Sequence, residues 1–168
     1  RTSRAGRQQV LYAHSQNVTI INNVFYNNNR GWHIQLSDGA SNWLVANNTF
    51  AFGNANGEAG QIMFWGNNSG ITMRNNIFYN PNSSPLTRYQ ANVTNSPFDH
   101  NLVYGTSTVI SDTTGFPVGT NQIDTHPSFV NSPTAHFHFH VNSGPSVTPA
   151  ELNIYPVHIN MYDTAPHQ

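Results

Sequence analysis

The sequence predicts an all-β fold in which short strands stack into a solenoid. A short segment recurs four times along the 168-residue chain, each time around a central Asn: Asn23, Asn48, Asn76 and Asn101. The first and third intervals between these anchors are equal, and the second is slightly longer. Around the anchors apolar residues alternate with polar ones, as at Val18 and Ile20, and this period of two is typical of strands. The strong helix formers Leu, Glu and Lys are scarce, which disfavours a helical fold.

Each repeat reads as strand, turn, strand, Asn turn and strand. The recurring segments cover residues 20–26, 45–51, 73–79 and 98–104. At a fixed distance before each anchor stands a small turn-forming residue, namely Asn17, Asn42, Gly70 or Asn95. A second strand register precedes two of the repeats, at Gly31–Leu36 and Gly60–Trp65.

Equivalent residues of successive repeats are expected to stack, because one such unit cannot bury its apolar face alone. Two inward columns follow: Phe25, Phe50, Phe78 and Val103 in one, and Ile20, Val45, Met73 and Phe98 in the other. The Asn anchors should form an inward ladder in which each amide bonds the amides of neighbouring turns.

The Asn-Asn-x-Phe unit, seen in NVTIINNVFYNN and GITMRNNIFYNP, resembles the repeat of the pectate-lyase-like superfamily. The resemblance covers residues 9–105. It extends weakly over 124–147, where His126-Pro127-Ser128-Phe129 resembles a closing segment in which Asp is usual in place of His126. It implies a right-handed parallel β-helix in a secreted protein, extracellular or on the cell surface. The superfamily includes lyases, glycosidases, epimerases, tailspikes and adhesins, and some members use Ca²⁺.

At the coil length that the anchor intervals define, the chain is expected to form five to six coils of a single domain, 1–168. Regular coils should occupy 9–105, and irregular closing coils and a tail 106–168. Since the chain begins in mid-repeat, we expect it to be part of a longer protein.

Charge and composition exclude several classes of partner. All six basic residues are Arg, and the net charge is −1 without a basic stripe, which argues against nucleic acid or an anionic membrane as a partner. No apolar run approaches the roughly 20 residues of a membrane span. Without Cys there is no disulfide, thiolate nucleophile or Cys-built metal site.

The second strand register supplies the candidate site. Strict alternation places His33, Gln35, Ile62 and Phe64 on its outer face. An exposed Phe64 beside amides would form a platform for the C–H face of a sugar, with Gln35 bonding hydroxyls.

In this family lyases use Arg or Lys as base, and glycosidases use two carboxylates. We therefore assign Arg88, His33 and Glu58 as candidate catalytic residues. The candidate substrate-binding residues are Phe64, Gln35, Arg30 and Asp38, of which Asp38 would pair with Glu58 in acid chemistry. Each assignment has a non-functional alternative. The Arg residues would be solvated side chains at turns, and a loop over 52–60 would cover Phe64.

Metal binding receives little support. The five Asp and two Glu are scattered singly along the chain, so one coil does not supply a calcium cluster, and calcium rests on the resemblance alone. In a strand, His136, His138 and His140 would share one face and suit a metal, but a polar face opposite buried Phe explains the pattern as well. Arg74 and Asp99 occupy equivalent positions in successive coils and are expected to form an exposed ion pair.

Two functions remain open. The first is a secreted polysaccharide-active or polysaccharide-binding protein, lyase-like on acidic glycans or glycosidase-like. The second is a structural module of an extracellular adhesin, tailspike or filament. The small number of charged groups that can converge on one face favours binding or structure over a complete active site.

Overall fold

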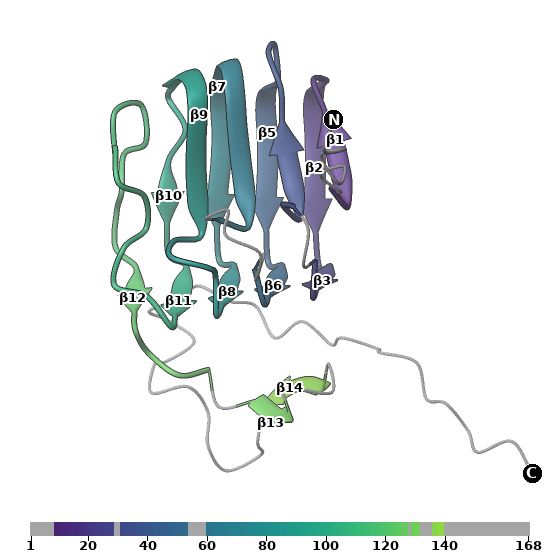
Figure 1. Cartoon of the computed structure of the whole chain (residues 1–168), viewed down its shortest axis with the longest axis vertical. Helices are drawn as coiled ribbons and strands as arrows, with labels where there is room; N and C mark the ends of the chain where they lie inside the picture. Colours follow the sequence, from purple (N-terminus) through teal and green to yellow (C-terminus); the bar gives the residue numbers. More distant parts are fainter. Residues whose placement is uncertain (1–8, 29–30, 54–59, 128, 132–135, 140–168) are drawn as a thin grey trace, which may run out of the picture.

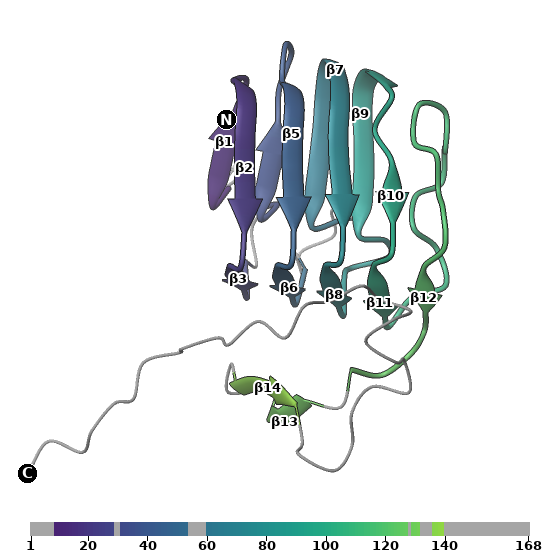
Figure 2. The same cartoon turned by 180° about the vertical axis from the view of Figure 1, so that it is seen from behind.

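A computed structural model describes residues 9–28, 31–53, 60–127, 129–131 and 136–139. The first three of these ranges form a parallel β-solenoid, with successive turns side by side along its axis (Figures 1 and 2). The strands are β1 Leu11–Ala13, β2 Gln16–Ile21, β3 Val24–Tyr26, β4 Ile34–Leu36, β5 Ser41–Ala46, β6 Thr49–Ala51, β7 Ile62–Arg74, β8 Ile77–Tyr79, β9 Leu86–Thr94, β10 Phe98–Asp99, β11 Leu102–Tyr104, β12 Gln122–Ile123, β13 Phe129–Asn131 and β14 His136–Phe139. No helix long and apolar enough to cross a membrane occurs in these ranges.

Two parallel sheets build the solenoid. The smaller sheet has the order β12-β11-β8-β6-β3. The larger has the order β1-β4-β7-β5-β2, with β9 and β10 also paired to β7. The long strand β7 pairs with β4 through its first residues and with β5 through its later ones, and β9 follows β7 along both parts. Strands β7 and β9 therefore join two faces of the solenoid into one bent sheet.

The number of complete turns is about three, so the expected five to six is wrong. Three successive turns contribute strands to every face: β2 to β4, β5 to the start of β7, and the end of β7 to the start of β9. The last turn lacks a strand between β11 and β12, where residues 105–121 form an irregular loop. Dividing the whole length by the repeat overestimates the turns, because the described residues 105–121 do not follow the repeat.

The Asn-rich turns use the left-handed backbone region, which Asn tolerates better than most residues. The residue before each ladder anchor has a positive φ, at Asn22, Asn47, Asn75 and His100. The predicted turn positions Asn17, Asn42, Gly70 and Asn95 also have positive φ, between 48° and 64°. Asn17, Asn42 and Gly70 nevertheless lie within β2, β5 and β7, so at these positions the backbone bends inside a strand and does not form a separate turn. The positive φ before each anchor explains why Asn recurs in pairs, since one Asn adopts the unusual φ and the next enters the ladder.

The predicted Asn ladder is present. The Nδ2 of Asn23 donates to Oδ1 of Asn48 at 3.2 Å, and the same bond joins Asn48 to Asn76 at 3.1 Å and Asn76 to Asn101 at 3.0 Å. The ladder continues one rung further than the repeat indicates, from Asn101 to Asn121 at 3.2 Å. Each amide also bonds backbone carbonyls, as Asn48 does at Ile20 and Ala46. The ladder therefore satisfies turn backbone that the interior would otherwise leave unpaired.

Both predicted inward columns are confirmed. The rings of Phe25 and Phe50 stack at 4.7 Å, and those of Phe50 and Phe78 at 4.9 Å. Strand register also aligns Ile20, Val45, Met73 and Phe98. Phe50 and Phe78 are fully buried, whereas Phe25 is half-buried.

A loop seals the other end of the core. Ile110 and Phe116, from the 105–121 loop, are buried in the main hydrophobic cluster. Beyond the loop, β13 pairs antiparallel with β14. Phe129 of β13 packs against Tyr79 on the outer side of the smaller sheet.

Candidate functional site

The predicted platform residue Phe64 faces the core, so its outward placement is wrong. Its exposed fraction is 0%, and its ring meets that of Phe116 at 4.8 Å. The strand register explains the error. Aligning Gly31 with Gly60 would place Leu36 opposite Trp65, whereas Leu36 pairs with Phe64, one position earlier. A slip of one residue exchanges the two faces of a strand.

The other residues placed outward are buried as well. Ile62 is buried in the core in register with Ile34, and Gln35, in register with Met63, is only 5% exposed. His33 is 1% exposed, with its ring centroid 6.0 Å from those of Phe25 and Phe50. These side chains are therefore not available to a polymer on the surface.

His33 is a buried imidazole without strong partners. Desolvation lowers its pKa to about 4, against a smaller opposing effect of backbone groups at Phe52 and Ala51. Neither ring nitrogen makes a hydrogen bond of good geometry. The neutral imidazole packs against Phe rings in the core. In the described part of the chain it is not exposed to a substrate at the surface.

Arg88 is engaged at the end of the core. Its Nη1 lies 2.8 Å from Oδ2 of Asp112, its Nη2 donates to the carbonyl of Thr114, and its guanidinium lies 5.2 Å from the ring centroid of Phe116. Hydrogen bonds from Thr114 and, less strongly, the charge of Arg88 hold the pKa of Asp112 below its usual value. Arg88 thus fastens the 105–121 loop.

Asp38 is the predicted site residue that lies on the surface. It is exposed, and its Oδ1 accepts a hydrogen bond of 2.6 Å from the backbone N–H of Asn67. Gly66, at the bend of β7, has a φ of 68°, and a Cβ there would lie 2.8 Å from Asp38 Cβ. Glycine at 66 therefore allows both the bend and the close approach of Asp38.

Other predicted residues fall outside the part of the chain that the structure describes. These are Arg30, Glu58 and His140, together with the side chains of His136 and His138. Within the described ranges no three His, Cys, Asp or Glu side chains gather as metal ligands.

Arg74 and Asp99 are adjacent in register, but Asp99 pairs with His100 at 2.8 Å, so the expected Arg74–Asp99 ion pair is wrong.

An exposed aromatic pair lies one residue beyond the predicted platform. Trp65 of β7 and Tyr89 of β9 are cross-strand partners, 40% and 49% exposed, with ring centroids 5.3 Å apart in a T-shaped arrangement. The sequence-based assignment includes neither residue. The register that it assumed, which is wrong by one residue, turns Trp65 inward. The spacing of the Asn anchors could have given the correct register. Asn48 and Asn76 are as far apart in the sequence as Leu36 and its partner Phe64, and this spacing turns Trp65 outward.

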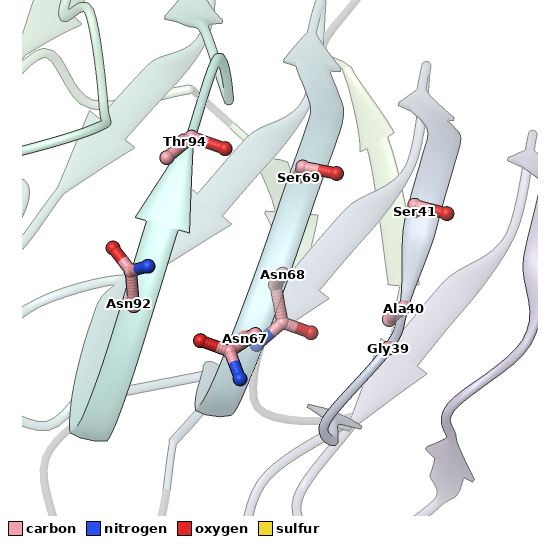
Figure 3. A pocket seen from close by; sticks show the side chains of 8 residues that line it. All are labelled: Gly39, Ala40, Ser41, Asn67, Asn68, Ser69, Asn92 and Thr94. Atoms are coloured by element: carbon pink, nitrogen blue, oxygen red, sulfur yellow. The ribbon is translucent and has the colours of Figure 1, made fainter.

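A polar groove lies along β5, β7 and β9 (Figure 3), and its first lining residue on β7, Asn67, is two residues after Trp65. It is shallow, with a volume of about 370 Å³, and is lined by Gly39, Ala40, Ser41, Asn67, Asn68, Ser69, Asn92 and Thr94. Ser41, Ser69 and Thr94 are aligned in register and place a row of hydroxyls across three strands. Neighbouring strands lie about 4.8 Å apart, so these polar groups repeat along the solenoid axis.

Comparison with protein-family models, curated proteins and solved structures found no match for this chain.

Proposed function

We propose that the protein is a polysaccharide-binding solenoid that acts outside the cell or at its surface. The observation that carries this proposal is the exposed Trp65–Tyr89 pair beside a groove lined by amides and hydroxyls. The pectate-lyase-like resemblance of the repeat supports it.

The chemistry of the site suits a sugar polymer. An aromatic ring gives the C–H face of a pyranose a large apolar contact without ordering a flexible side chain. The adjoining hydroxyls and amides both donate and accept, as sugar hydroxyls do. A shallow groove open along the strands admits a chain at any point, whereas a small molecule is usually held in a deeper pocket.

Binding is favoured over catalysis by the positions of the described acids. Asp38 stands beside the groove, whereas Asp112 pairs with Arg88 and Asp99 with His100. A glycosidase needs two carboxyl groups across one glycosidic bond, and the described acids form no such pair at the groove.

The proposal is tested by retention on a panel of soluble polysaccharides in native affinity electrophoresis. Trp65→Ala and Tyr89→Ala should each reduce retention about tenfold, without lowering the unfolding temperature, because exposed rings contribute little to the core. Tyr26→Ala, an exposed aromatic on the smaller sheet, is the matched control and should retain binding. Absorbance from a new C=C bond would instead identify a lyase, and new reducing ends a hydrolase.

A structural module is the second candidate. The continuous amide ladder from Asn23 to Asn121 and the stacked Phe column make the solenoid a stiff spacer, as a filament or adhesin requires. Wild-type protein that migrates unchanged in every polysaccharide tested would favour this function.

A further inference from the structure

We infer that the groove beside Trp65 and Tyr89 selects uncharged polysaccharides and that Asp38 excludes acidic ones. This inference rests on the proposed function and names its substrate class. It departs from the acidic glycan that the sequence alone suggests.

The groove itself is uncharged. Its eight lining residues are Gly, Ala, Ser, Asn and Thr, none of which carries a charge near neutral pH. Amides and hydroxyls of this kind bond neutral sugar hydroxyls but give a uronate carboxylate no counter-ion. Binding an anion there would remove its hydration without a compensating ion pair.

Asp38 adds a fixed negative charge between the aromatic pair and the groove. Its carboxylate lies against Gly66 and accepts from the backbone N–H of Asn67, so it stands between Trp65 and the groove-lining Asn67 on the same strand. The hydrogen bond holds this charge in place. A glycan chain that contacts the ring of Trp65 and continues into the groove must pass it.

The described cations do not offset Asp38. Arg88 is paired with Asp112 at the end of the core. Arg74 is exposed at the far end of β7, beyond Ser69 by roughly 16 Å of extended strand. That separation exceeds the Debye length of about 10 Å at 0.1 M salt, so the charge of Arg74 attracts an anion in the groove only weakly.

The test compares retention on a neutral polymer, arabinoxylan, with retention on an acidic one, polygalacturonate, at pH 8, where imidazoles are largely neutral. Wild type should be retained by arabinoxylan and not by polygalacturonate. Asp38→Asn removes the charge and keeps the local structure, because the amide oxygen still accepts from the N–H of Asn67. It should gain at least threefold in polygalacturonate retention at 20 mM salt, and less at 150 mM. Asp124→Asn, which removes the same charge from an exposed site at the end of β12, is the matched control and should change neither.

The possible failures are distinguishable. Trp65-dependent retention of wild type on polygalacturonate, or an Asp38→Asn variant that gains nothing there, would overturn this inference and leave the proposed function standing. Absence of retention on every glycan would overturn the proposed function itself.

Discussion

His33 places a titratable ring in the interior of the solenoid, beside the stacked rings of Phe25 and Phe50. Burial lowers its pKa to about 4 because a charged imidazolium would lose its hydration there. In the unfolded chain the same imidazole has its ordinary pKa near 6.5. Between these two values the unfolded state binds more protons than the folded state.

The free energy of unfolding should therefore rise with pH between about 4 and 6.5, and the His33 contribution should be complete above pH 7. The full difference is about 3 kcal/mol, since one pH unit of pKa difference corresponds to about 1.4 kcal/mol. Urea unfolding at pH 4.5 and pH 7.5 measures most of this difference. In His33→Leu this dependence should largely disappear, whereas in His100→Gln, a change at a half-buried surface position, it should persist. An unchanged pH dependence in His33→Leu would contradict the assignment.

At single residues, the sequence predicts the core better than the surface. Phe50, Phe78 and the Asn anchors follow from a local motif whose repetition fixes their stacking. Trp65 does not, because its face depends on a register between strands of different turns, and an error of one residue reverses it. Burial cannot be foreseen for His33 either, since its polar ring looks like a surface residue in any pattern based on polarity.

At the scale of the strand, the Phe column holds the smaller sheet against the larger one. Phe50 is fully buried between two parallel neighbours, so Phe50→Ala should lower the free energy of unfolding by about 3–5 kcal/mol through the cavity left behind. Phe25→Ala is the matched comparison and should have a smaller effect, because Phe25 is half-buried with one described Phe neighbour. Chemical denaturation of both variants measures the difference. Equal losses would show that the end of the column is as enclosed as its middle.

The amide ladder is the polar counterpart of this column. Asn48→Leu should destabilise by roughly 1–3 kcal/mol, because the backbone N–H of Asn23, the amide of Asn23 and the carbonyl of Ile20 would each lose a partner. The same change at the exposed Asn92, which lies outside the ladder, should alter stability by less than about 0.5 kcal/mol. Thermal or urea unfolding tests this contrast. A loss below that threshold in Asn48→Leu would mean that water replaces the missing amide.

Element boundaries follow the sequence only where the motif is present. The pattern marks the strand registers at 31–36 and 60–65, but it misses Leu11–Ala13 before them and the last strand of that face, Leu86–Thr94. That strand carries Arg, Tyr, Gln and Asn and lacks the paired Asn motif. Its pairing is imposed by β7, to which it is hydrogen-bonded over most of its length, and tertiary pairing of this kind is invisible in one sequence.

At the scale of the whole molecule, the repeat predicts a stacked solenoid but not where it stops. The regular turns end because residues 105–121 leave the repeat and fold over the last coil, with Phe116 beneath Phe64. A solenoid opens most readily from its ends, since a terminal turn has one neighbour instead of two. The fastening of this loop should therefore control how easily the molecule opens from its C-terminal end.

Arg88 is the residue that fastens it, through Asp112, the carbonyl of Thr114 and the ring of Phe116. In Arg88→Met, the loop should detach more often, and the backbone amides that bond its carbonyls should exchange hydrogen several-fold faster. These are the amides of Ser96 and Phe98, bonded to Gly115 and Pro117. The amide of Thr49, bonded to Asn23 in the first rungs, should exchange at its wild-type rate, because local opening at one end does not reach it. Arg74→Met removes an exposed Arg from the same sheet and should leave all three amides unchanged. Equal acceleration at Thr49 and Phe98 in Arg88→Met would instead show that the loop and the solenoid unfold together as one cooperative unit.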